Sequence, residues 1–184
     1  MRLFVSVDLP DRLAAPIADL QAKFEPASGL SFTDPEQAHL TLKFLGETDP
    51  DRIDDIEAAL ESAVADADVD PFEATFEGLG VFPSMEYVSV VWLGVGQGAA
   101  AFERLQTSIE ERLVNRGFDP EEHDFTPHVT LARMNHAGGK ELVQELVRTE
   151  DPTVGTMTVE EVRLTESDLT ADGPVYETIH RARL

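Results

Sequence analysis

A four-residue pattern, His-x-Thr-Leu, occurs twice in this chain, and the repeat limits the possible folds more than any other feature. The copies occupy residues 39–42 and 128–131, so they start 89 residues apart in a chain of 184 residues. Each copy lies in a predicted strand that follows a predicted helix and precedes another helix and further strand. The sequence therefore predicts an internal duplication, with two similar lobes facing each other in a single domain, 1–184.

The spacing of hydrophobic residues and the positions of Gly and Pro predict a chain that mixes helices and strands. Helices are predicted where apolar residues recur every three or four positions. The predicted helices cover residues 10–24, 51–65, 99–116 and 139–147. The predicted strands cover residues 1–8, 38–46, 72–80, 86–94, 127–133, 153–165 and 175–181.

The charge is strongly acidic, because 36 acidic residues outnumber 14 basic residues and give a formal net charge of -22. Such a surface repels nucleic acid in dilute salt. The acidic residues are spread through predicted helices, and lysine is scarce. This composition resembles that of proteins from salt-accumulating cells, where a Debye length of roughly 3 Å at molar salt screens distant charges. A merely acidic mesophilic protein is the alternative.

Two absences exclude further classes of protein. The chain has no cysteine, which excludes disulfides, thiolate metal sites and cysteine nucleophiles. No segment approaches the roughly 20 consecutive apolar residues of a membrane helix, and residues 1–8 predict a strand rather than a signal peptide. We therefore expect a cytoplasmic protein with no membrane partner.

Each motif offers one polar face and one apolar face. Side chains alternate along a strand, so the histidine and threonine of each motif point one way and its two aliphatic residues point the other. Two such strands facing across a cleft would present His39, Thr41, His128 and Thr130 to one ligand.

This set of side chains suits phosphoryl chemistry at a cyclic phosphate. Near neutral pH, a neutral imidazole takes a proton from attacking water while an imidazolium gives a proton to the departing sugar oxygen. Threonine hydroxyls donate hydrogen bonds to the non-bridging phosphate oxygens. No metal or other cofactor is needed, and a zinc site is disfavoured because no third ligand has a recognisable spacing.

Two cationic residues are candidates for the same cleft. Lys43 shares the strand parity of His39, so it is a candidate cleft residue, with a solvated lysine at the strand end as an equal alternative. Arg133 falls on the opposite face from His128 by the same parity, and it reaches the cleft only if the strand ends or twists near Ala132.

The remaining histidines carry no such prediction. A single His-x-Thr pattern is common in half-buried strands, and only its repetition gives the pattern weight. His123, His136 and His180 lie outside both motifs and are expected at the surface or in loops.

The motifs and their surroundings resemble the two-histidine phosphoesterase superfamily, and within it the RNA 2′,3′-cyclic phosphodiesterases once called 2′-5′ RNA ligases. The resemblance covers nearly the whole chain, and both motifs are intact. It rests on residues 2–5, 8–10, 39–47, 80–83, 92–94, 127–133, 164–167 and 173–176.

The resemblance implies an α+β fold with two lobes, built from two antiparallel β-sheets with outer helices around a central cleft. It implies hydrolysis of a terminal RNA 2′,3′-cyclic phosphate to a 2′-phosphomonoester, with RNA 3′ ends or nucleotides as the partner. We expect the chain to be a monomer. His39 would be the proton donor to the leaving 3′ oxygen, and His128 the proton acceptor from water. Thr41 and Thr130 would bind the phosphate, and Arg133 stands where the family places a functional arginine.

Two alternatives use the same residues. The reaction run in reverse is 2′-5′ RNA ligation, and a cleft without catalysis is a binding module for RNA ends. The acidic surface departs from the basic surface usual for a protein that handles RNA, so binding would depend more on shape and base stacking. Phe4, Phe44 and Tyr176 are candidates for stacking, and each is equally explained as a core residue.

Overall fold

The computed structural model describes residues 1–184 and contains four α-helices and nine β-strands. The helices are α1 (Ala14–Ala22), α2 (Ile53–Ala67), α3 (Ala99–Val114) and α4 (Lys140–Thr149). Short 3-10 turns precede α1 and α2, and a third precedes β3. The strands are β1 (Arg2–Asp8), β2 (Leu30–Phe32), β3 (His39–Glu47), β4 (Phe72–Pro83), β5 (Val88–Val95), β6 (His128–Met134), β7 (Thr153–Val159), β8 (Glu161–Thr170) and β9 (Gly173–Arg183).

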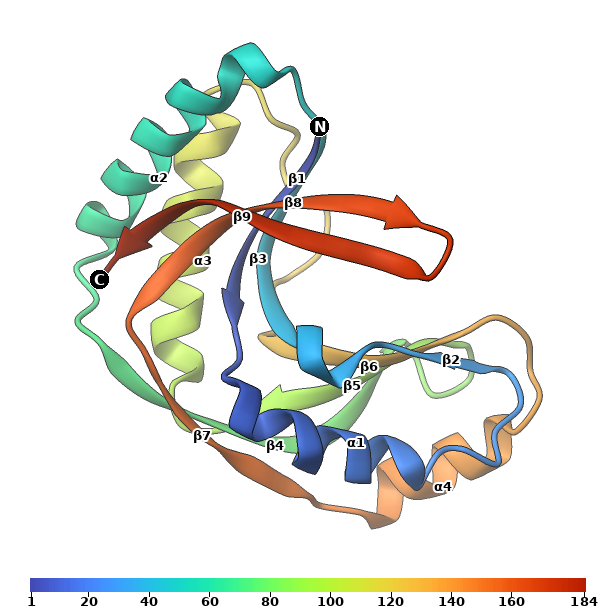
Figure 1. The fold of residues 1–184 in the computed structure, drawn as a ribbon. Helices are drawn as coiled ribbons and strands as arrows, with labels where there is room; N and C mark the ends of the chain where they lie inside the picture. The colour runs from blue at the N-terminus through green and yellow to red at the C-terminus, as the bar shows by residue number, and fades with distance from the viewer.

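All strand pairs are antiparallel, and eight strands follow one another in the order β7-β4-β5-β6-β3-β1-β8-β9. The sheet curls strongly, so its two halves form two lobes (Figure 1). The halves meet where β3 and β6 share a single pair of partners, Leu40 and Val129. The expected α+β fold with two antiparallel sheets and outer helices is confirmed, with the refinement that the two sheets are halves of one continuous sheet.

The helices cover the two halves in an exchanged arrangement. α2 and α3 pack on each other beside the β3-β1-β8-β9 half, where α3 contacts β3 and α2 contacts β9 (Figure 1). α1 contacts β6 and β7, and α4 contacts β4, so both belong to the other half. The helix that follows β1 therefore packs on the half built around β6, and the helix that follows β5 packs on the half built around β3. This crossing gives each lobe elements from both parts of the chain.

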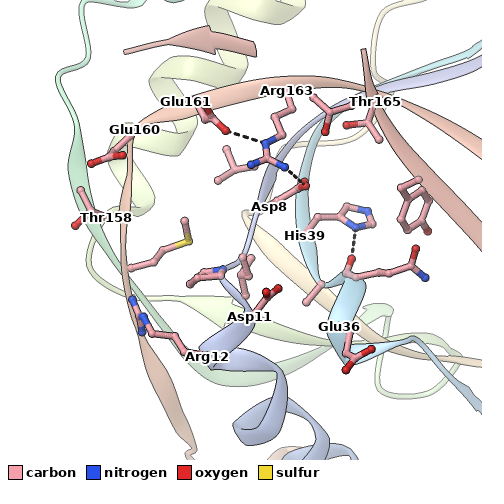
Figure 2. A pocket seen from close by; sticks show the side chains of 18 of the residues that line it. Asp8, Asp11, Arg12, Glu36, His39, Thr158, Glu160, Glu161, Arg163 and Thr165 are labelled. Atoms are coloured by element: carbon pink, nitrogen blue, oxygen red, sulfur yellow. Dashed lines mark hydrogen bonds and ion pairs between the residues drawn. The ribbon is translucent and has the colours of Figure 1, made fainter. Parts of the chain in front are cut away.

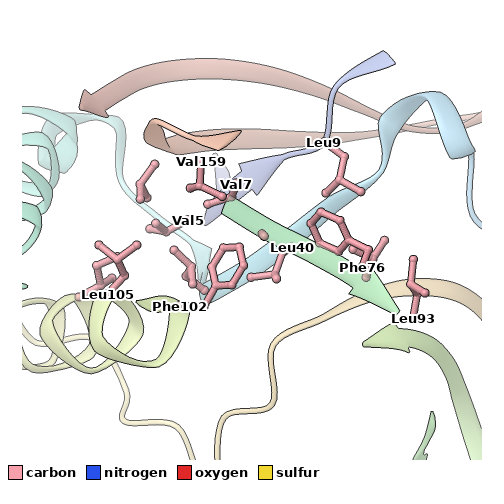
Figure 3. Packing of buried hydrophobic residues seen from close by; sticks show 14 of the residues in the cluster. Val5, Val7, Leu9, Leu40, Phe76, Leu93, Phe102, Leu105 and Val159 are labelled. Atoms are coloured by element: carbon pink, nitrogen blue, oxygen red, sulfur yellow. The ribbon is translucent and has the colours of Figure 1, made fainter. Parts of the chain in front are cut away.

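The central part of the core lies between α3 and the sheet at the junction of the two halves. Phe102 and Leu105 of α3 lie near Val5 of β1 and Leu40 of β3, and all four are fully buried (Figure 3). They belong to one cluster of 37 buried hydrophobic residues. Because Leu40 and Val129 anchor their strands in this cluster, the opposite faces of β3 and β6 turn away from it. The core thus holds the two motif strands by their aliphatic side chains.

Two parts of the fold differ from the prediction. The predicted strand at residues 153–165 is two strands, because the chain turns at Glu160 from β7 at one edge of the sheet to β8 beside β1. No Gly or Pro marks this turn, and the carbonyl of Glu160 accepts a hydrogen bond from the amide of Leu184 instead. The short strand β2 was not predicted; it pairs with the later part of β6.

No helix of this structure combines the length and the apolar composition needed to cross a membrane.

Candidate active site

The four motif side chains meet at the junction of the two half-sheets. Antiparallel pairing of Leu40 with Val129 places Thr130 next to His39 and Thr41 next to His128. Leu40 and Val129 point into the core, so the histidines and threonines share the opposite, partly accessible face. The structure therefore brings together the two motifs as the sequence predicts.

A β-bulge lies at the last residue of each motif. The β1–β3 ladder pairs Ser6 with Thr41 and Val5 with Lys43, so Leu42 is an extra residue. The β5–β6 ladder skips Leu131 in the same way, because Thr130 pairs with Trp92 and Ala132 with Val91. Each bulge gives its strand two consecutive buried residues and reverses the alternation beyond them.

The bulge corrects the parity prediction for Arg133. With Leu131 unpaired, Ala132 is buried and Arg133 returns to the face of His128 and Thr130. Its guanidinium makes no hydrogen bond or ion pair within the chain and lies close enough to lower the pKa of both histidines. Arg133 is thus an unengaged cation beside the two imidazoles.

The same kind of bulge in β3 contradicts the expectation that Lys43 reaches the cleft. Lys43 is 2 % exposed and lies on the core side of β3. Its ammonium donates to the carboxylate of Glu110 on α3 at 2.6 Å and to the carbonyl of Asp119 at 2.9 Å. The residue that lies on the face of His39 and Thr41 after this bulge is Phe44, which is 65 % exposed. Lys43 is therefore a structural residue that ties α3 and the following loop to β3.

Both histidine rings are held in the same orientation by the backbone. Nδ1 of His39 lies 2.9 Å from the carbonyl oxygen of Gln37, and Nδ1 of His128 lies 2.7 Å from that of Thr126. A carbonyl only accepts, so Nδ1 of each ring carries a proton and donates it. Nε2 is then the atom that gains or loses a proton in each ring, because no side chain or backbone group of the protein hydrogen-bonds to it.

Burial lowers the pKa of both histidines. Desolvation is the main cause at His39 and at His128, and the positive charge of Arg133 acts in the same direction. The two carbonyl hydrogen bonds oppose this effect. At His39 the carboxylate of Asp8 also raises the pKa. His128 has no carboxylate among the causes of its shift; His39 is a further cationic neighbour.

Aromatic side chains enclose each imidazole. The ring of His39 lies 5.1 Å from Phe4 and 5.0 Å from Tyr176, measured between centroids. The ring of His128 lies 4.9 Å from Phe82 and 6.0 Å from Trp92. These rings fix the imidazoles on two sides and account for the desolvation that lowers the pKa of each. Phe44 also contacts this group through Phe4, at 6.3 Å between centroids.

The threonine hydroxyls have no partner within the chain. Neither Thr41 nor Thr130 uses its side-chain oxygen in a hydrogen bond to the protein, and both side chains are partly accessible. The backbone carbonyl of Thr130 accepts instead from the hydroxyl of Thr33 at 2.9 Å, which ties β6 to the segment after β2. Both hydroxyls are free to donate to a ligand on the histidine face.

A cavity of about 750 Å³ opens beside His39 (Figure 2). It is lined by the end of β1, the 3-10 turn before α1, the turn before β3 and the β7–β8 turn, and it reaches Tyr176 but not His128. Arg163 crosses its wall, donating to Asp8 at 2.8 Å and to Glu161 at 2.9 Å. Asp8 and Arg163 were not predicted as site residues. The register of β1 against β3, which sequence does not give, is what places Asp8 opposite His39.

The other histidines lie outside this site. His123 is exposed in the loop after α3, and His136 accepts a hydrogen bond from the amide of Gly138 in an exposed turn. His180 on β9 contacts Glu57 and Glu61 of α2. No group of three or more His, Cys, Asp or Glu side chains in the structure is arranged to hold a metal ion.

A curled antiparallel sheet carrying paired His-x-Thr motifs at its centre is the arrangement of a two-histidine phosphoesterase. Residues 9–171 match the family model of the 2′-5′ RNA ligase superfamily, and the chain belongs to that family. It is 35% identical over 186 residues to a protein of Methanothermobacter thermautotrophicus named RNA 2′,3′-cyclic phosphodiesterase, covering 100% of this chain and 99% of the relative.

Solved structures agree with this assignment. The fold superposes on the crystal structure of TT0787 of Thermus thermophilus with a TM-score of 0.81 and 29% identity, over 100% of this chain and 98% of the other. It superposes on E. coli LigT complexed with 3′-AMP with a TM-score of 0.79 and 26% identity, over 100% of this chain and 97% of the other.

Proposed function

We propose that this chain is an RNA 2′,3′-cyclic phosphodiesterase that opens a terminal cyclic phosphate to a 2′-phosphomonoester. The observation that carries the proposal is the pair of identically held imidazoles, each with Nδ1 on a carbonyl and Nε2 without a protein partner. Relatives that match nearly the full length of this chain are named RNA 2′,3′-cyclic phosphodiesterase. Its substrates are then RNA 3′ ends or nucleotides with a cyclic phosphate.

The reaction needs one proton donor and one proton acceptor on opposite sides of phosphorus. Water attacks the phosphorus in line with the 3′ oxygen, and Nε2 of neutral His128 takes the proton of that water. The bond from phosphorus to the 3′ oxygen breaks as Nε2 of protonated His39 gives its proton to that oxygen. The product keeps its phosphate on the 2′ oxygen. The cycle ends when His128 loses the proton that it took from water and His39 is protonated again.

The other polar groups stabilise the charge that grows on the phosphate. Thr41 and Thr130 donate their free hydroxyls to the two non-bridging oxygens. Arg133 supplies positive charge on the same face and is not neutralised by any carboxylate of the chain. Arg133 offsets the acidic surface locally, because only charges within a few ångströms act strongly on a bound phosphate at high salt.

The proposed acid and base imply a defined pH dependence. The value of kcat/KM reports the free enzyme and is highest where one imidazole is protonated and the other neutral. Since the pKa of both histidines is lowered, the bell-shaped profile should be centred on the acid side of pH 6.5, the ordinary pKa of histidine. A profile that is flat across this range, with chemistry limiting the rate, would contradict the proposed roles.

The test is hydrolysis of an RNA oligonucleotide that ends in a 2′,3′-cyclic phosphate, with chelator present, at low and at molar salt. The products are resolved as 2′- or 3′-phosphates. We expect a 2′-phosphate, lost in His39→Ala and in His128→Ala but not in His123→Ala, whose histidine is exposed and outside the site. Folded protein that gives no product, or gives a 3′-phosphate, would refute the proposal.

A second strand in the same assay tests ligation. An added oligonucleotide with a 5′-hydroxyl is consumed only if the residues run the reaction in reverse. Joined product in place of hydrolysis would assign the chain to 2′-5′ ligation.

A further inference from the structure

The two halves of the site correspond residue by residue. His39, Thr41 and Phe44 of β3 occupy the positions that His128, Thr130 and Arg133 occupy on β6, with a bulge before the last of each set. The neighbouring strands, β1 and β5, run beside them with matching registers. Orientation, tautomer and motif are therefore the same for both histidines. Nothing in the motifs alone tells which ring holds the proton.

The neighbouring strands differ in charge at the position opposite each histidine. Asp8 of β1 pairs with His39, whereas Gly94 of β5 pairs with His128. A carboxylate thus stands beside one histidine, and a residue without a side chain stands beside the other. The asymmetry lies on the face of the sheet that carries both imidazoles.

The second half cannot accommodate a carboxylate at the equivalent place. A Cβ added to Gly94 would lie 2.9 Å from the backbone oxygen of Glu77 and 3.2 Å from the indole of Trp92. The Trp92 ring, which lies 6.0 Å from His128, fills the space that a side chain would need. The packing around His128 therefore keeps this position apolar.

Asp8 is held in place by neighbouring side chains. One carboxylate oxygen accepts from Arg163 at 2.8 Å, and the other accepts from the hydroxyl of Ser6 at 3.3 Å. Arg163 is itself shared with Glu161, at 2.9 Å (Figure 2). Glu161 also accepts from Arg181. The carboxylate is fixed by this chain, and its charge is partly but not fully balanced by a shared guanidinium.

Charged and titratable groups lie around His39 on β1, β6 and β9 and in the turn before β3. Asp8 of β1 favours its protonated form, while Arg133 of β6 disfavours it. Tyr176 of β9 is neutral, because burial raises the pKa of its phenol. Glu36, in the turn before β3, lines the same cavity at its exposed rim. His128 faces Arg133 and His39, and both disfavour a proton on it.

We propose that Asp8 is a positioning residue that decides which of the two equivalent imidazoles carries the proton before the reaction, making His39 the acid and His128 the base. The acid and base roles in this inference rest on the proposed function. Its physical content is a difference in proton affinity between two rings that are otherwise held alike.

The test measures each imidazole separately by NMR titration. The rings interact, so their apparent pKa values belong to the pair. His39 is therefore titrated in a His128→Gln background, and His128 in a His39→Gln background. Asp8→Asn keeps the shape of the side chain and an oxygen for Arg163. We expect it to lower the pKa of His39 and to leave that of His128 in place.

Two further variants separate electrostatics from structural damage. Asp11→Asn removes the same charge from the same cavity, at an exposed residue that is not among the causes of the His39 shift, and should leave both rings unchanged. Arg163→Gln frees the Asp8 charge and should raise the pKa of His39, opposite in sign to Asp8→Asn. If the pKa of His39 moves in the same direction in Asp8→Asn and in Arg163→Gln, the inference is overturned. It is also overturned if Asp8→Asn leaves the pKa of His39 unchanged.

Kinetics supply a second readout in the otherwise unmodified enzyme. In Asp8→Asn the alkaline limb of kcat/KM, which reports loss of the proton from His39, should move to lower pH while the acid limb stays. Movement of the acid limb instead would reverse the assignment of acid and base. The NMR arm needs no substrate, so a protein without turnover would refute the proposed function and leave the proton assignment to be decided by titration.

Discussion

Replacing Lys43 by Met should destabilise the protein strongly and leave catalysis intact. The ammonium is buried, and it is bonded to Glu110 and to the carbonyl of Asp119. Its removal leaves the Glu110 carboxylate, whose side chain is only 20% exposed, without its cation. Breaking a buried ion pair from one side costs about 3–5 kcal/mol, and the partial exposure of Glu110 favours the lower end.

A loss of about 3 kcal/mol lowers Tm by about 6–12 °C in a chain of this size. Thermal and urea unfolding at fixed salt measure the change. Lys23→Met is the matched control, because the pair of Lys23 with Glu150 is well exposed, at 48% and 38%, and should contribute less than about 1 kcal/mol. The double variant Lys43→Met/Glu110→Leu should recover most of the loss, since an apolar pair of similar volume replaces two buried charges.

The same variant tests where Lys43 points. Because its ammonium lies on the core side of β3, kcat/KM of folded Lys43→Met should stay within about twofold of the wild type. A destabilisation no larger than that of Lys23→Met would refute the buried pair. A tenfold loss of activity in folded protein would place the lysine in the cleft after all.

Three further outcomes follow from the site. The free energy of unfolding should fall as pH drops below 6.5, because the lowered pKa of His39 and His128 lets the unfolded chain bind more protons than the folded one. Urea unfolding at several pH values measures this, and the dependence of the free energy on pH should be weaker in either His→Gln variant. An unchanged pH dependence would contradict burial as the cause of the lowered pKa. Thr41→Val and Thr130→Val should each reduce kcat by about 10²-fold or more with little change in KM, whereas an effect on KM alone would assign the hydroxyls to ground-state binding. Arg133→Gln should reduce kcat/KM and raise the pKa of both histidines in NMR titration, and a variant that changes neither would remove Arg133 from the site.

The central strands and their polar and apolar faces could be predicted from the sequence because they depend on short-range rules. Alternation within His39 to Leu42 and within His128 to Leu131 predicts a polar and an apolar face, and the structure has both. The helices were predicted from apolar spacing, and α2, α3 and α4 fall within a few residues of the expected ranges. Local patterns are sufficient for these elements.

The positions just beyond the motifs could not be read in this way. Alternation places Lys43 in the cleft and Arg133 outside it, and both placements are reversed by the bulges at Leu42 and Leu131. A bulge depends on the pairing with the neighbouring strand and on packing against the core. The sequence of the bulged strand alone therefore does not predict it. The resemblance to the family placed Arg133 better than parity did.

The pairing of strands distant in the chain could not be predicted from the sequence either. Asp8 reads as the polar end of an opening strand, and only the register of β1 against β3 places it beside His39. The separation of β7 from β8 has the same origin, because the turn at Glu160 is defined by where the two strands find partners. Sequence patterns identify strands more readily than they identify neighbours.

The exchanged packing of the helices has a consequence for how the molecule comes apart. A fragment of residues 1–70 would contain α1 without β6 and β7, the strands that α1 covers. The remaining fragment would contain α3 without β3. Neither piece has a complete interior, so the two parts of the chain are interlocked like the subunits of a segment-swapped dimer. Such a chain should melt in one step, with the two lobes losing structure together.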